Sequence, residues 1–362
     1  MRKLLFYLDY RSRSGAQRVM VELANYFAEH GDSVTLACQF QSPEEGYSLS
    51  DKINEVILPK PSSNKLKRQG DRIKALCNLC QTEQPDLIIS FLIICNMIAI
   101  KVGNKLNIPV LISVRNDPGR DGNFIKKLLI KHNYPKASGC VFQTEEAREY
   151  FNYTYPTKVI MNPLSKEILE SLDEVGISEK TENTFTFISL GRLEPQKRHD
   201  VTIRALSKIK EKNVILKIFG KGPLESSLKE LASDLGVKDR VIFAGVTSHV
   251  AEELLKADAF VMASDYEGMP NALMEAMAAG LPCIVTDCPC GGPKSLIVDG
   301  ENGFLVEVGN YDDLSEKMKV VIDNPVKAEV LGEKAKSIKQ KCDIKNVAPQ
   351  WAEMFDLCRK TR

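Results

Sequence analysis

Short β-rich runs alternate with helical patterns along almost the whole chain, and this alternation limits the possible folds more than any other feature. In the first half the runs are apolar on both faces, as are parallel strands covered by helices on both sides. They read KLLFYL, SVTLAC, DLIISFL, PVLISV, GCVFQT and KVIMN. Between the first two, an apolar stripe through Val19, Leu23 and Phe27 indicates a helix over 16–30. This order predicts a doubly wound α/β domain.

The second half repeats the plan, with TFTFISL, VILKIFG, RVIFAG, AFVMAS, PCIVTD and GFLVEV as strands. Helices are expected near 198–211, 223–236, 249–257, 271–279, 293–298, 311–322, 326–340 and 345–360. At 362 residues the chain exceeds what one hydrophobic core usually serves. We therefore predict two Rossmann-like domains, 1–163 and 184–342, joined by a linker over 164–183. The helix in 343–362 is expected to pack back toward the first domain, and the two sheets to face each other across a cleft.

Composition excludes several classes of protein. Residues 1–160 carry 22 Lys and Arg against 16 Asp and Glu, whereas the remainder carries 27 against 32, so the amino half is mildly basic. The ten cysteines fall largely within apolar runs, which favours a reduced, cytoplasmic protein. The longest nearly apolar stretch, Leu87–Ile100, is too short to span a membrane and is expected to be a strand followed by a buried helix. No nucleic-acid partner is predicted.

The first candidate site follows the strand TFTFISL, where the chain reads GRLEPQKRHD (191–200). Arg192 and Lys197 place two cations over one loop, and Pro195 stiffens that loop before a helix. Two cations beside a helix amino terminus suit a diphosphate, because Arg offers a bidentate fork and Lys a point charge. A solvated basic turn explains the same residues equally well when they are taken alone.

The second candidate site is SDYEGMPNALMEAMAAG (264–280), which sets Glu267 and Glu275 eight positions apart. Glu267 stands at a strand tip and Glu275 inside the following helix. The free N–H groups of that helix suit phosphate oxygens, and they belong to Asn271, Ala272 and Leu273. A carboxylate at Glu275 would be repelled by phosphate but accepts hydrogen bonds from the hydroxyls of a ribose. One acid for a sugar, helix N–H groups for phosphate and one acid for a ribose indicate a nucleotide-sugar.

These motifs together resemble those of the retaining glycosyltransferases of family 4, which have the two-Rossmann GT-B fold. The resemblance lies in E-x7-E after a strand, preceded by G-R-x-x-x-x-K. Three further segments support it: SGAQRVMVELANYFAEHGDSVTL, IFGKGPLESSLKELASDLGVKDRVIFAGV and CPCGGPKSLIVDGENGFLV. The similarity covers nearly the whole chain, and its motifs are most specific in the carboxyl half.

The resemblance implies a role for each matching residue. Arg192 and Lys197 would bind the donor diphosphate and take the leaving-group charge, and Glu267 would contact the transferred sugar, which makes these three the expected catalytic residues. The resemblance implies further contacts to the donor from Gly15, Phe243, Gly245, Gly268, Asn271, Ala272, Leu273 and Glu275, with Gly15 near the diphosphate, Phe243 and Gly245 at the base and Glu275 at the ribose. It also implies that neither a metal nor another cofactor is needed, and no D-x-D supported by further acids follows a strand.

One departure from the family lies in the loop SVRNDPGRDG (113–122), where many members carry a His close to the transferred sugar. Arg115, Asn116 or Asp117 is expected to supply the polar contact on this acceptor side. Which of the three points inward stays open, because Asp117 before Pro118 equally suits a simple turn.

The segment NFIKKLLIKHNYPK (123–136) interleaves apolar residues with lysines in the domain expected to bind the acceptor. This pattern suits an undecaprenyl-diphosphate-linked glycan acceptor and an anionic membrane surface at the inner face of the cytoplasmic membrane. A core-facing helix with a solvated lysine face accounts for the same pattern.

The sequence therefore predicts a metal-independent, retaining glycosyltransferase that moves a sugar from a nucleotide donor, a UDP-hexose or UDP-N-acetylhexosamine, to a glycan acceptor. Alternatives are a GDP-mannose-dependent mannosyltransferase of the same fold and a UDP-sugar 2-epimerase. An NAD-dependent dehydrogenase needs G-x-G-x-x-G after the first strand, and YRSRSGAQ lacks it. A non-catalytic sugar-nucleotide-binding protein would have no need of Glu267.

Overall fold

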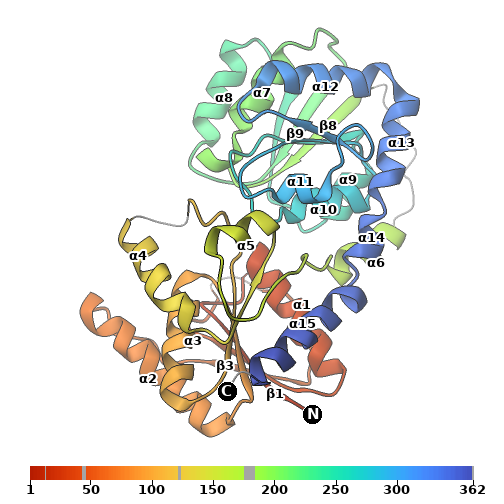
Figure 1. The fold of residues 1–362 in the computed structure, drawn as a ribbon. Coiled ribbons are helices and arrows are strands. Elements are labelled where there is room, and N and C mark those ends of the chain that lie inside the picture. Colours follow the sequence, from red (N-terminus) through yellow and green to blue (C-terminus); the bar gives the residue numbers. More distant parts are fainter. Residues whose placement is uncertain (13, 43–45, 121–123, 175–183, 361–362) are drawn as a thin grey trace. The chain divides into compact units, whose positions relative to one another are not determined.

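The computed structural model describes residues 1–12, 14–42, 46–120, 124–174 and 184–360, and it divides into two compact units. Unit 1 comprises Met1–Ser165 together with Cys342–Arg362, and unit 2 comprises Lys166–Lys341. The chain therefore leaves unit 1, builds unit 2 and returns, as the colours of Figure 1 show. Each unit is an α/β body around one parallel sheet, which confirms the predicted fold class.

The sheet of unit 1 has seven parallel strands in the order β3-β2-β1-β4-β5-β6-β7. The order reverses between β1 and β4, and ligands of such sheets bind beyond the carboxyl ends of the strands at that point. The strands are β1 Lys3–Leu8, β2 Ser33–Cys38, β3 Ile53–Ile57, β4 Leu87–Phe91, β5 Val110–Ser113, β6 Gly139–Phe142 and β7 Thr157–Val159. Its helices are α1 Gly15–Glu29, α2 Lys65–Glu83, α3 Ile93–Leu106, α4 Phe124–Asn133, α5 Glu145–Phe151 and α15 Ile344–Lys360.

The sheet of unit 2 has six parallel strands in the order β10-β9-β8-β11-β12-β13, with the reversal between β8 and β11. The strands are β8 Phe185–Leu190, β9 Val214–Phe219, β10 Val241–Gly245, β11 Ala259–Met262, β12 Cys283–Thr286 and β13 Phe304–Val306. The helices are α6 Lys166–Glu174, α7 His199–Ser207, α8 Glu225–Asp234, α9 Val250–Leu255, α10 Asn271–Ala278, α11 Gly292–Leu296, α12 Tyr311–Asp323, α13 Pro325–Ala335 and α14 Ile338–Lys341.

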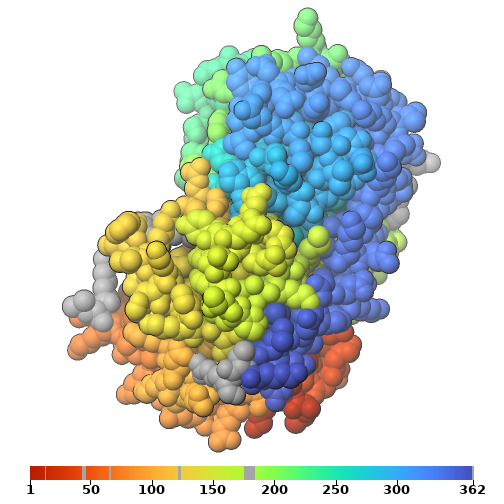
Figure 2. All heavy atoms as spheres, viewed as in Figure 1, coloured from red at the N-terminus to blue at the C-terminus, as the bar shows by residue number. Residues whose placement is uncertain are grey.

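Helix α15 closes the core of unit 1. The Trp351 and Phe355 side chains are fully buried, and their rings lie 5.6 Å from Phe91 of β4 and 4.8 Å from Phe27 of α1, respectively. Figures 1 and 2 show this last helix against the first helix of the chain. Burying four large aromatic rings where α15 meets β4 and α1 provides much of the hydrophobic stabilisation of this side of the sheet.

Three elements differ from the sequence expectations. Strand β3 was not predicted, because it lies at the sheet edge and its residues, INEVI, are partly or fully exposed. The expected linker contains helix α6, which belongs to unit 2, while 175–183 lie outside the described residues. The single helix expected at 326–340 is two helices, α13 and α14.

The stretch Leu87–Ile100 is a strand followed by a buried helix, as predicted. Within the described part of the chain no helix is long and apolar enough to cross a bilayer.

Candidate active site

Lys197 and Glu267 meet at the carboxyl ends of β8 and β11, where the strand order of unit 2 reverses. The Nζ atom of Lys197 lies 2.5 Å from Oε1 of Glu267, and the two side chains are 18% and 9% exposed. The hydroxyl of the buried Ser264 donates to the same carboxylate oxygen at 2.7 Å. A largely desolvated carboxylate is therefore held by a cation and a hydroxyl, an arrangement stronger than a surface ion pair.

A further hydrogen bond holds the backbone of Ser264 in place. The Thr286 hydroxyl, at the end of β12, donates to the Ser264 carbonyl at 2.6 Å, and both residues are fully buried. Glu267 is thus positioned from two neighbouring strands. Sequence analysis did not identify Ser264 or Thr286, although both stand where polar residues at strand ends are informative.

The turn after Glu267 requires a glycine opposite it. A Cβ atom on Gly292, the first residue of α11, would lie 1.6 Å from the carbonyl oxygen of Gly268. Because no side chain fits this gap, only glycine lets the two backbones approach so closely. The requirement for glycine therefore lies at position 292, against the Gly268 carbonyl, and the predicted contact of Gly268 to a donor stays a prediction.

Helix α10 begins at Asn271, directly after Pro270. Its first intrahelical bond runs from Met274 N to the Pro270 carbonyl at 3.2 Å, so the N–H groups of Asn271, Ala272 and Leu273 precede the helical ladder. These donors and the positive end of the helix dipole favour an anion beside the Lys197–Glu267 pair. Glu275 lies further along α10 and is only 8% exposed, so the two glutamates of the motif are both buried.

The two predicted diphosphate cations differ in environment. Lys197 ends the short 3-10 turn Pro195–Lys197 and is directed to Glu267. Arg192 is 67% exposed, and its Nη1 atom bonds to Glu194 at 2.9 Å. The structure thus brings Lys197 and Glu267 together and leaves Arg192 on the surface of the loop.

His199 follows Lys197 and begins helix α7. Burial and the neighbouring Lys197 cation lower the pKa of this imidazole to about 4. His199 is consequently neutral at neutral pH and packs beneath the loop.

Phe243 and Gly245, the residues predicted to contact the nucleotide base of the donor, lie on the edge strand β10. They flank an irregularity in its pairing with β9. Gly245 has a φ of +72°, and its carbonyl accepts from Gly220 N at 2.7 Å. The Lys229 Nζ atom lies 5.5 Å from the centre of the Phe243 ring. This strand end is accordingly a bent edge with a partly buried aromatic ring.

In unit 1, Gly15 is the first residue of α1, with Ser14 as its N-cap. Asp117 accepts from Gly119 N at 2.8 Å, the hydrogen bond of a turn, which agrees with the simpler of its two interpretations. Arg115 donates from Nη2 to Asn162 Oδ1 at 2.5 Å, and its guanidinium lies 4.7 Å from the centre of the Phe91 ring. Arg115 and Asn116 line a cavity of about 280 Å³.

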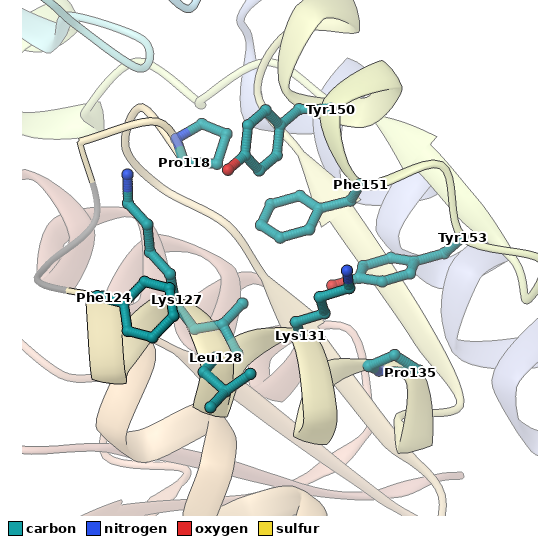
Figure 3. Close-up of a pocket in the computed structure, with 10 residues that line it drawn as sticks. Pro118, Phe124, Lys127, Leu128, Lys131, Pro135, Tyr150, Phe151 and Tyr153 are labelled. Atoms are coloured by element: carbon teal, nitrogen blue, oxygen red, sulfur yellow. The ribbon is translucent and has the colours of Figure 1, made fainter.

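Helix α4 carries exposed apolar side chains. Phe124 is 79% exposed, Ile125 65% and Leu128 58%, so the interpretation as a core-facing helix fails for most of its apolar residues. Figure 3 shows a larger cavity, of about 640 Å³, between α4 and the rings of Tyr150, Phe151 and Tyr153. Lys127 and Lys131 also line it, so an apolar hollow lies beside two ammonium groups.

Two sequence models of protein families match the chain. The model described as Glycosyltransferase Family 4 matches residues 13–163, and the model described as Glycosyl transferases group 1 matches residues 173–338. Both predicted domains are thus matched by families of one enzyme class.

Individual proteins similar to this chain are consistent with these family matches. A glycosyltransferase of Haemophilus influenzae described as uncharacterized is 27% identical over 360 residues, 97% of this chain and 99% of its own. The UDP-Gal:alpha-D-GlcNAc-diphosphoundecaprenol alpha-1,3-galactosyltransferase of Escherichia coli is 24% identical and covers 86% of each chain. The crystal structure of Anabaena HepE in complex with UDP and glucose matches the fold with a TM-score of 0.79 at 19% identity, covering 98% of this chain and 100% of that one.

Two parallel α/β units, a cation and a glutamate joined at a strand-order reversal, and two family matches that together span most of the sequence lead to one conclusion. The chain belongs to the family 4 glycosyltransferases with the GT-B fold.

Proposed function

We propose that this glycosyltransferase moves a sugar from a UDP-sugar to a lipid-diphosphate-linked glycan, with retention of configuration and without a metal ion. The observation that carries the proposal is the buried Lys197–Glu267–Ser264 arrangement beside the amino terminus of α10. It offers a carboxylate for sugar hydroxyls and a cation with helix N–H groups for phosphate, side by side.

The reaction would proceed on one face of the donor sugar. The bond between the anomeric carbon and the diphosphate oxygen breaks, and the nucleoside diphosphate departs with the electron pair. The acceptor hydroxyl forms the new bond on the same face and passes its proton to the departing phosphate. Lys197, Arg192 and the N–H groups of α10 would stabilise the charge that develops on that leaving group.

The choice of donor and acceptor rests on relatives. HepE was crystallised with UDP and glucose, and the Escherichia coli relative is named for UDP-galactose and a diphosphoundecaprenol-linked acceptor. A Campylobacter jejuni relative, 26% identical over 65% of this chain, is also named for a diphospho-undecaprenol-linked acceptor. These names support a cytoplasmic enzyme working at the inner face of the membrane, in the assembly of surface polysaccharide or glycoprotein glycans.

The donor is tested by calorimetry of the purified protein against UDP, GDP, ADP and NAD with EDTA present. We expect micromolar binding of UDP that Lys197→Ala abolishes. Binding of GDP instead would keep the chemistry and change the donor to a GDP-sugar. Binding of NAD alone, or of no nucleotide, would refute the proposal.

Membrane attachment through α4 is tested separately, by sedimentation with vesicles that contain anionic lipid. We expect salt-sensitive binding, weakened by the triple variant Lys126→Glu, Lys127→Glu, Lys131→Glu and also by Phe124→Ser with Leu128→Ser, because the helix exposes both ammonium groups and apolar side chains. Arg148→Gln on α5 is the matched control of surface charge. Absence of binding in the wild type would remove the membrane from the proposal.

A further inference from the structure

Arg115 in unit 1 is a half-buried cation with an incomplete set of partners. One of its nitrogens, Nη2, donates to Asn162, and the guanidinium stacks on Phe91. Its Nε and Nη1 atoms are buried and have no hydrogen-bond partner within the described part of the chain. Leaving charged donors desolvated and unbonded is costly, and native proteins seldom do so without a ligand or a functional reason.

A second cation increases that cost. Arg18 of α1 is only 3% exposed, and burial together with its neighbouring charge lowers the pKa of Arg115 to about 9. Two guanidinium groups of like charge therefore share one buried region. No carboxylate of the described residues forms an ion pair with Arg115, so no acid in this part of the fold compensates its charge directly.

Arg72, in the same unit, shows how the fold handles a buried arginine that serves structure alone. It is 4% exposed, and it bonds to the carboxylate of Asp9, to Tyr7 Oη at 3.3 Å and to Gln39 Oε1 at 3.2 Å. Its charge is thus compensated by an acid. Arg115, by contrast, has no carboxylate partner among the described residues.

Arg115 also lines a space that an anion could fill. The cavity of about 280 Å³ is lined by Arg115, Asn116, Lys126 and Tyr134, with Asp9 at another wall already engaged by Arg72. It lies beyond the carboxyl ends of β1, β4 and β5, at the strand-order reversal of this sheet. Ligands of doubly wound sheets bind at such positions.

We propose that Arg115 binds a phosphoryl group in unit 1, in the cavity that it lines at the strand-order reversal of this sheet. Phosphate oxygens can accept separate charge-assisted hydrogen bonds from Nε and from Nη1 and supply a negative charge. Binding of a phosphoryl group follows from the residues themselves. Its source, the diphosphate of a lipid-linked acceptor or that of the donor, rests on the proposed function.

The site is tested with inorganic pyrophosphate as the probe, by calorimetry and thermal shift on the full chain carrying Lys197→Gln, which removes the cation of the other site. Arg115→Gln is expected to weaken pyrophosphate binding about tenfold or more, because a charged hydrogen-bonding pair contributes roughly 1.5–3 kcal/mol. Arg148→Gln, an equal change of charge on the surface of α5, should change affinity less than about twofold.

The same samples show whether the variant folds. Removing one of two like buried charges should leave the melting temperature of the ligand-free protein unchanged or higher, while abolishing the rise that pyrophosphate causes in the parent. Should Arg115→Gln fail to fold, Arg115→Lys, which keeps the charge but loses the planar guanidinium, and Arg18→Gln take its place, with intermediate losses of affinity expected. Unchanged pyrophosphate affinity in the folded variants would overturn the proposal.

Two further probes, used in the chain with Lys197 intact, identify the source of the phosphoryl group. Loss of farnesyl diphosphate binding in Arg115→Gln, with UDP binding retained, assigns the site to the acceptor; loss of UDP binding assigns it to the donor. Either result supports a phosphoryl site. A wild type that binds pyrophosphate through Arg115 but never binds UDP would contradict the proposed function while leaving this site intact.

Discussion

The two strand-order reversals of this molecule carry opposite electrostatics. In unit 2 the cation Lys197 is neutralised by Glu267, and the pair is completed by the Ser264 hydroxyl. In unit 1 the cation Arg115 has a second cation, Arg18, as its charged neighbour. The same topological position thus holds a compensated charge in one unit and an uncompensated charge in the other.

The difference bears on how each region would meet a ligand. An anion that enters the Lys197 site competes with the carboxylate of Glu267. This carboxylate keeps Lys197 ordered, but it lowers the net attraction between the site and the anion. An anion entering the Arg115 site relieves a repulsion, so attraction is greater and the empty site is less stable. Paired charges suit a group that must be held in register for chemistry, whereas a cation without a carboxylate partner, such as Arg115, suits capture of an anion.

The largest expected effect is on catalysis. Glu267→Ala should lower the rate of sugar transfer about 100-fold or more, because it removes the carboxylate that we propose contacts the transferred sugar. Glu253→Ala provides the matched control, since Glu253 is also paired with a lysine, Lys217, in the same unit but away from the strand-order reversal. Initial rates with saturating donor and acceptor measure both. A Glu267→Ala enzyme at near wild-type rate would show that the pair is structural only.

The second effect concerns stability and tests the comparison directly. Lys197→Met should lower the free energy of unfolding by about 3 kcal/mol, because it leaves Glu267 buried without its cation, whereas Arg115→Met should lower it little or raise it. Adding Glu267→Gln to Lys197→Met should recover much of the loss. Urea unfolding followed by tryptophan fluorescence and circular dichroism measures all four proteins. Equal losses for the Lys197 and Arg115 variants would break the contrast between the two units.

The third effect tests the backbone support of Glu267. Gly292→Ala should lower the free energy of unfolding by about 2 kcal/mol and weaken UDP binding, since the new Cβ would overlap the Gly268 carbonyl. Gly70→Ala is the control: it lies within helix α2 with no atom in contact, so it should stabilise by roughly 0.5–1 kcal/mol. Unchanged UDP binding in Gly292→Ala would show that the turn adapts.

The smallest effect is a pH dependence at the Lys197 loop. The pKa of His199 is about 4 in the fold, against about 6.5 for an imidazole exposed to water, so on acidification the unfolded chain takes up the proton before the folded chain does. Stability from this group is therefore fully present above pH 6.5 and is lost as the pH falls toward 4, by about 2 kcal/mol at pH 4.5. Unfolding free energies of wild type and His199→Gln at pH 7 and 4.5 measure it. Parallel losses in the two proteins would contradict this assignment.

Much of the fold was predictable because parallel strands buried on both faces read as apolar runs, as in KLLFYL and TFTFISL. Strand β3 was not, since INEVI sits at an exposed edge where burial imposes no pattern. The candidate site of unit 2 was predictable in its members, since Lys197 and Glu267 both follow strands. Arg18 gave no signal, because a basic residue in an amphipathic helix ordinarily faces water.

By itself the sequence determined the alternation of strands and helices, the polar residues that follow the strands, and the motifs of the family. These are local properties, set by periodicity and by the residues that can end a strand or begin a helix. Only the tertiary structure decided which charges meet. Lys197 and Glu267 are 70 positions apart, and Arg18 and Arg115 are 97 apart. Pairing over such distances depends on strand order, which brings distant loops to one edge of a sheet.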